Sequence, residues 1–169
     1  TLLKLATSVP GEFVKSNNIF CSWSAGIGFW DVDLPALSKI IPNEMFPNAS
    51  LIFEHRENSK YVIWNGVYGE MQDDSGKGGY DLFHTFGVVL PSIIEKLMID
   101  GKVSSKTFLY FKYKLFRYLC GLYYLEVVCD TERSFIIGNI RKDMSFYYND
   151  FLYHIMILYA NLKKYIVKK

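Results

Sequence analysis

The chain has 169 residues, of which 50% are hydrophobic, 17% aromatic and 21% charged, a composition that excludes a disordered, low-complexity polypeptide. Its three cysteines, Cys21, Cys120 and Cys129, show no CxxC spacing, so we expect neither a disulfide framework nor a zinc site. We therefore expect reduced thiols and a cytoplasmic protein. No basic-then-apolar leader and no window of roughly 18 uncharged apolar residues is found, so no membrane-spanning helix is expected.

The formal net charge of +2 is the sum of two opposed parts. Residues 1–100 contain 7 Lys and Arg against 12 Asp and Glu, a balance of −5, whereas residues 101–169 contain 12 against 5, a balance of +7. The basic part is also the more aromatic. No helix-turn-helix, RNA-recognition or zinc-finger pattern accompanies its cations, so nucleic acid is not the expected partner. The charge balance divides the chain into regions 1–100 and 101–169.

Short strands are predicted in the first region. Residues 18–23 and 26–30 are apolar runs interrupted by glycines, and residues 49–53 and 60–68 are two further candidate strands. A short helix is predicted over residues 33–41, with Asp33 as its N-cap and Pro42 as its stop. The first region is therefore expected to contain a small sheet.

Helices are predicted for the rest of the chain. A glycine-rich loop at residues 72–79 leads into an amphipathic helix over 80–100, with a kink expected near Gly87 and Pro91 and an end at Gly101. Further helices are expected over residues 105–127 and 147–166, separated by a segment of uncertain structure around residues 135–137. The predicted fold class is α+β, a small strand-containing N-terminal part followed by a C-terminal helical part.

Two motifs invite a ligand-binding interpretation. The DxD sequence of residues 31–33 has the carboxylates that Mg²⁺ or Mn²⁺ prefers, but only 30 residues precede it, too few for a nucleotide-binding βαβ region, so a helix cap is preferred. The loop at residues 76–79 lacks the spacing of a P-loop, although Lys77 and its backbone amides are suited to a phosphate. We therefore expect no metal site in this segment.

Three blocks carry a family resemblance: residues 24–30 (SAGIGFW), residues 46–53 (FPNASLIF) and residues 77–82 (KGGYDL). In this order and spacing they resemble the acceptor-side, C-terminal half of a bacterial family 2 glycosyltransferase with a GT-A fold, as used in polysaccharide biosynthesis. The resemblance covers roughly residues 20–100. It implies that region 1–100 is the acceptor-side portion of a GT-A-like domain with an incomplete sheet, and that 101–169 is an aromatic and basic helical region.

The same resemblance implies a reaction. The complete enzyme would use a nucleotide sugar and a divalent metal, Mg or Mn, to glycosylate a glycan or lipid-linked acceptor with inversion, while this segment alone would be inactive. Glu44 and Asp81 are the carboxylates nearest the matching blocks and are the candidate catalytic, hydroxyl-orienting groups. The candidate substrate-binding residues are Trp30, Asn48, Trp64, Lys77, Tyr80 and His84. Asn48 stands where similar enzymes often have His. For all these residues, packing or solvation remains an alternative.

A second interpretation rests on the C-terminal region. Residues 108–119 and 151–164 combine bulky apolar residues with cations at helical length, as in helices that lie in an anionic lipid interface. Lys112, Lys114 and Arg117 are the candidate membrane-surface cations. On this interpretation the chain is a non-catalytic membrane-surface or partner-binding module, peripheral on the inner face of the cell membrane. A packed helical core with a solvated basic face remains open.

Overall fold

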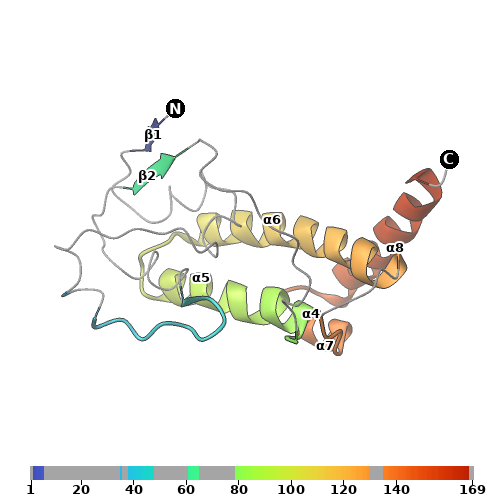
Figure 1. Cartoon of the computed structure of the whole chain (residues 1–169), viewed down its shortest axis with the longest axis horizontal. Coiled ribbons are helices and arrows are strands. Elements are labelled where there is room, and N and C mark those ends of the chain that lie inside the picture. The colour runs from blue at the N-terminus through green and yellow to red at the C-terminus, as the bar shows by residue number, and fades with distance from the viewer. Residues whose placement is uncertain are drawn as a thin grey trace. The chain divides into compact units, whose positions relative to one another are not determined.

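The structure, a computed structural model, describes residues 2–5, 35, 38–47, 61–64, 79–129 and 135–167 (Figure 1). The chain divides into two compact units, one comprising Thr1–Glu70 and Ser92–Phe111 and the other Met71–Pro91 and Lys112–Lys169. Each unit is described by itself below.

The first unit contains a short antiparallel ladder. Strand β1, Leu2–Leu5, pairs with strand β2, Tyr61–Trp64, so that Leu2 lies opposite Trp64 and Leu5 opposite Tyr61. In the segment 38–47, the Asn43 side chain accepts hydrogen bonds from the backbone N–H groups of Met45 and Phe46, both at 3.0 Å. These bonds form an Asx turn that ends at Phe46, whose side chain is buried.

The same unit contains the turn between two helices, α5 (Leu90–Ile99) and α6 (Ser105–Tyr123). Gly101 has φ of +74°, the left-handed conformation that glycine adopts without a Cβ penalty. The backbone N–H groups of residues 101–103 then return to the last carbonyls of α5, and the Ser104 side chain accepts from the Thr107 N–H at 3.1 Å. The first helix therefore ends at the predicted Gly101, and the second begins at the predicted residue 105, with Ser104 as its cap.

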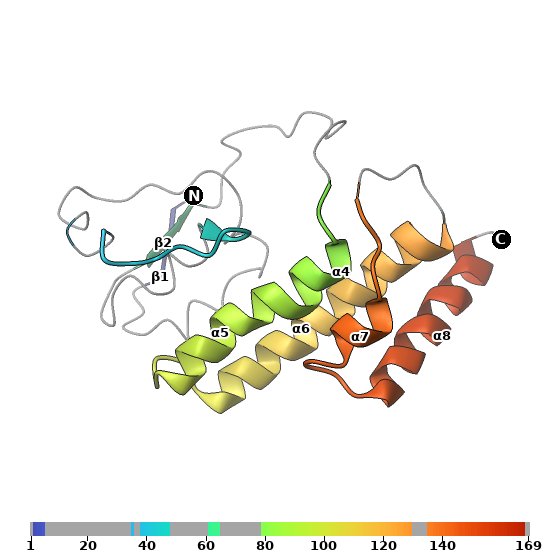
Figure 2. The same ribbon diagram turned by 90° about the horizontal axis from the view of Figure 1, so that it is seen from below.

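The second unit is helical. It begins with α4, Leu82–His84, which passes directly into the π-helical turn η3, Thr85–Val89, and then into α5. Helix α6 likewise passes into the π-helical turn η4, Tyr124–Val128. The last two helices are α7, Ile140–Met144, and α8, Asp150–Val167. In Figure 2, α7 lies between α4 and α8, and contacts of α7 with both helices agree with this view.

The widened turn η3 has a local cause in the sequence. Pro91 has no N–H, and its ring crowds the carbonyl four residues earlier, at Gly87. A π-helical turn at Thr85–Val89 places the irregularity just before the proline, with the Leu90 N–H bonded to the Thr85 carbonyl. The kink predicted near Gly87 and Pro91 therefore takes this form.

The core of the second unit is built from large apolar side chains on all of its helices. Phe83 is fully buried and its ring meets the edge of Tyr123, with ring centroids 6.2 Å apart. Phe86 meets Tyr118 in the same edge-on manner at 5.4 Å. Burial raises the pKa of Tyr118 to about 12, with smaller contributions from Tyr80 and Glu126. The other buried members are Leu82, Leu90, Leu115, Leu119, Cys120, Tyr124, Met144, Tyr148, Met156 and Ala160.

The predicted α+β class is wrong for the described part of the chain. An incomplete GT-A sheet was expected ahead of the helices, but the described residues are mostly helical, and the strands among them are β1 and β2, of 4 residues each. The physical reason is that the long apolar runs after residue 80 have helical periodicity and bury one another. The candidate strands at 18–23, 26–30 and 49–53 lie outside the described residues, as does most of the helix predicted over 33–41.

Among the described residues, one helical run has the length and composition of a membrane-spanning helix. The run is Leu82–Ile99, with a mean hydropathy of 1.5, and 56% of it is buried inside the fold. A buried core helix meets the same criterion.

Candidate functional site

The side chains of His84, on α4, and Asp143, on α7, lie at ion-pair distance from each other. The His84 Nδ1 atom lies 3.2 Å from the Asp143 Oδ1 atom, although the two residues are 59 positions apart in the sequence. The His84 side chain is 50% exposed, whereas that of Asp143 is 9% exposed. A carboxylate can only accept a hydrogen bond, so Asp143 favours the tautomer with the proton on Nδ1 and leaves Nε2 as an acceptor.

Asp81, one of the two candidate catalytic carboxylates, caps the helix that carries His84. Its Oδ1 atom accepts a hydrogen bond from the His84 backbone N–H at 3.0 Å, so it caps α4, and it does not contact the His84 ring through any described hydrogen bond. The other carboxylate oxygen lies directly against Gly138, where a Cβ atom would collide with it. Hydrogen bonds from Leu82 N to Ile136 O and from Ile136 N to Tyr80 O, both 3.0 Å, join the two segments. Asp81 thus fixes the start of the helix that carries His84.

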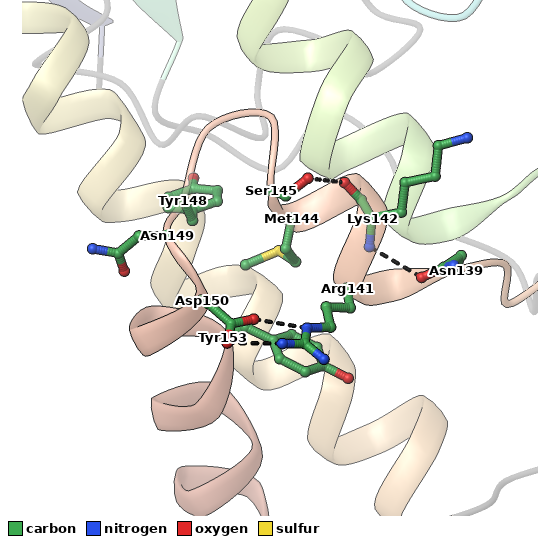
Figure 3. A pocket seen from close by; sticks show the side chains of 9 residues that line it. All are labelled: Asn139, Arg141, Lys142, Met144, Ser145, Tyr148, Asn149, Asp150 and Tyr153. Atoms are coloured by element: carbon green, nitrogen blue, oxygen red, sulfur yellow. Dashed lines mark hydrogen bonds and ion pairs between the residues drawn. The ribbon is translucent and has the colours of Figure 1, made fainter.

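A pocket of about 340 Å³ lies in the second unit, between α7 and the start of α8 (Figure 3). Neither His84 nor Asp143 lines it, and eight of its nine lining residues carry a polar group in the side chain. The lining residues are Asn139, Arg141, Lys142, Met144, Ser145, Tyr148, Asn149, Asp150 and Tyr153. Asp143 stands between two of them in the sequence.

Two asparagines in the pocket wall cap the helices that flank it. Asn139 accepts from the Lys142 N–H and Asn149 accepts from the Leu152 N–H, both at 3.0 Å, so these residues are the N-caps that begin α7 and α8. The Tyr148 hydroxyl donates to the Lys112 carbonyl at 3.0 Å, which fastens the connection between α7 and α8 to α6. Burial raises the pKa of Tyr148, so this hydroxyl stays a donor.

A bidentate ion pair between Arg141 and Asp150 joins α7 to α8 in the pocket wall. The Arg141 Nε atom donates to Asp150 Oδ1 at 2.7 Å and its terminal nitrogen donates to Oδ2 at 2.9 Å, as Figure 3 shows. The hydrogen bond with Arg141 is the main cause that lowers the pKa of Asp150, and the same bond raises the pKa of Arg141. A planar, paired guanidinium beside amides and tyrosines offers fixed hydrogen-bonding groups to a polar ligand.

The other predicted site residues are dispersed. Glu44 is exposed in the segment 38–47 of the first unit, and Tyr80 packs on Phe135 with ring centroids 5.1 Å apart in the second. Trp64 belongs to β2. Trp30, Asn48 and Lys77 lie outside the described residues. Within the second unit, Tyr80, Asp81 and His84 are neighbours in the sequence and lie at the start of α4.

The predicted membrane-surface cations do not share one environment. Lys112 is half-buried, with its Nζ atom 5.9 Å and 5.7 Å from the ring centroids of Tyr147 and Tyr148. Lys114 and Arg117 are exposed, and Arg117 lies 6.0 Å from the Tyr113 ring centroid. Lys112 therefore serves the packing of the second unit, and only the other two cations face solvent.

Sequence reasoning missed Asp143 and all nine residues that line the pocket. The two asparagine caps were available as signals, since Asn139 and Asn149 each precede a helix by one residue. No group of three potential metal-ligating side chains occurs in the ranges that the structure describes.

Comparison with protein-family models, with curated proteins and with solved structures finds no match for this chain.

Proposed function

We propose that this chain forms the acceptor side of a glycosyltransferase, in which the His84–Asp143 pair and the pocket between α7 and α8 bind hydroxyl groups of a glycan or lipid-linked acceptor. The observation that carries the proposal is the half-exposed imidazole of His84 held by a nearly buried carboxylate. This arrangement leaves the Nε2 atom of the ring as an acceptor, as a group that binds or deprotonates a hydroxyl requires.

The pocket chemistry supports a polyhydroxylated ligand. Its size, about 340 Å³, is within the usual range for small-molecule sites. Amide, hydroxyl, guanidinium and carboxylate groups can both donate to and accept from sugar hydroxyls. Tyr153, which is partly exposed, adds an aromatic ring to the wall. The resemblance of the three sequence blocks to family 2 glycosyltransferases suggests that the ligand is a sugar acceptor.

In the proposed reaction, the acceptor hydroxyl attacks the anomeric carbon of a nucleotide sugar, and the nucleoside diphosphate leaves. The His84 Nε2 atom accepts the hydroxyl proton or a hydrogen bond from it, while Asp143 holds the ring and stabilises its protonated form. A divalent metal, Mg or Mn, would stabilise the leaving diphosphate in the complete enzyme. The donor site and metal ligands are assigned to sequence beyond this chain, so 1–169 alone is expected to be inactive.

NMR of the histidine side chains tests ligand binding at this site. The chain has 3 histidines, His55, His84 and His154, so their imidazole Cε1–H resonances are few and separable. On titration with a panel of methyl glycosides, the resonance of His84 is expected to shift in a saturable manner. His154 lies 3.4 Å from Asp150, which lines the pocket, so its resonance is expected to respond to the same ligand. Equal shifts of all three resonances, or none at His84, would contradict the assignment.

A further inference from the structure

Helix α8 has an apolar face that the described fold leaves in solvent. Residues 151, 158, 162 and 166 recur at helical spacing and therefore share one side of the helix. Phe151 is 70% exposed, Leu158 60%, Leu162 53% and Ile166 74%. Tyr165 beside them is 76% exposed. We call these five residues the outer stripe.

The opposite face of α8 is anchored, which fixes the direction of the outer stripe. Met156 and Ala160 are fully buried. The Lys163 Nζ atom lies 4.4 Å from the Tyr124 ring centroid, and the Lys164 Nζ atom donates to the Val128 carbonyl at 3.1 Å. Both lysines were expected to reach outward, but they bind the helix to η4. Rotation of α8 to bury the outer stripe would break these contacts.

The charge of residues 151–169 indicates which kind of surface the outer stripe would bind. After Asp150, residues 151–169 contain no acidic residue and 4 lysines, two of which, Lys168 and Lys169, directly follow the end of α8. An aliphatic and aromatic stripe with a cationic end complements the acyl and headgroup region of an anionic bilayer, with tyrosine at headgroup depth. At 18 residues, α8 is long enough to lie along such a surface for about 27 Å.

We propose that α8 is a membrane-docking helix whose outer stripe inserts into the interface of an anionic lipid bilayer. This inference goes beyond the proposed acceptor site and does not depend on it, because the pocket between α7 and α8 and the outer stripe are tested by different ligands. It narrows the sequence-based expectation, which named residues 108–119 and 151–164 as interface helices and Lys112, Lys114 and Arg117 as the membrane-surface cations, to the outer stripe of α8.

Vesicle co-sedimentation of the full chain tests this proposal. The protein is expected to sediment with phosphatidylcholine vesicles that contain phosphatidylglycerol, and much less with phosphatidylcholine alone. The double variant Leu158→Gln/Leu162→Gln is expected to bind at least about 100-fold more weakly, because two apolar side chains no longer enter the interface. Raised salt should weaken the wild-type binding as the lysine contribution is screened.

A matched control removes equally exposed apolar residues from other helices. The variant Ile99→Gln/Leu109→Gln changes side chains that are 75% and 63% exposed, and it is expected to bind vesicles like the wild type. Far-UV circular dichroism should be the same for all three proteins, since the changed residues are exposed. Equal vesicle binding by the α8 variant, or no wild-type binding, would overturn the proposal. Self-association without vesicles that the α8 variant abolishes would also overturn it, in favour of a second copy of the chain.

Discussion

Replacing Phe83 with alanine is expected to lower the free energy of unfolding by about 3–5 kcal/mol. The Phe83 side chain is fully buried in the second unit and meets Tyr123 edge-on, with ring centroids 6.2 Å apart. The truncation removes the apolar transfer energy of the ring and leaves a cavity that neighbouring helices close only in part. Chemical denaturation followed by circular dichroism measures the change.

Phe146 provides the matched control for this substitution. Its side chain is 59% exposed, so Phe146→Ala is expected to change the free energy of unfolding by less than about 0.5 kcal/mol. If both variants lost the same small amount, the helical core described for the second unit would be incorrect. A large loss for Phe83→Ala alone would support it.

In the complete protein, His84→Gln is expected to lower kcat/KM for sugar transfer about 100-fold. Glutamine retains hydrogen-bonding groups but cannot take up the proton of an acceptor hydroxyl at neutral pH. Asp143→Asn should also lower kcat, because an amide no longer stabilises a protonated His84 ring. The control variant Ile99→Gln changes a side chain at the end of α5 that is 75% exposed, and it is expected to leave kcat/KM unchanged.

The pattern of these kinetic effects separates a direct role of His84 from a structural one. A structural defect would lower the amount of folded enzyme and the melting temperature, whereas loss of the proton acceptor should change the pH dependence of kcat with little change in stability. Unchanged transfer by His84→Gln would remove His84 from the proposed mechanism.

The helical part of the fold was largely predictable because strong local signals mark its ends. Gly101 ends α5 and α6 begins at residue 105, as predicted, and the irregular turn η3 lies where Gly87 and Pro91 indicated a kink. Helix α7 was missed because 5 residues are too few to show helical periodicity. Helix α8 begins three residues after its predicted start because Asn149 caps it.

The candidate site was less predictable because its partners are distant in the sequence. Asp81 and His84 were both selected from the sequence, but the carboxylate that binds the His84 ring is Asp143, 59 positions away. Local spacing cannot reveal such a pair. The cations of α6 and α8 illustrate the same limit: sequence reasoning treated Lys112 and Lys163 as outward-facing, whereas both lie beside tyrosine rings of the second unit.

The central claim, that this chain is the acceptor side of a glycosyltransferase, is tested most directly by donor turnover. The protein would be isolated from its native source at its natural length and incubated with nucleotide sugars, Mg²⁺ or Mn²⁺, and a lipid extract of the same source. Release of nucleoside diphosphate that requires the lipid extract, with transfer of the sugar to an extracted acceptor, is the predicted result. Absence of turnover with every donor, while anionic vesicles still bind α8, would contradict the claim and leave a membrane-surface module.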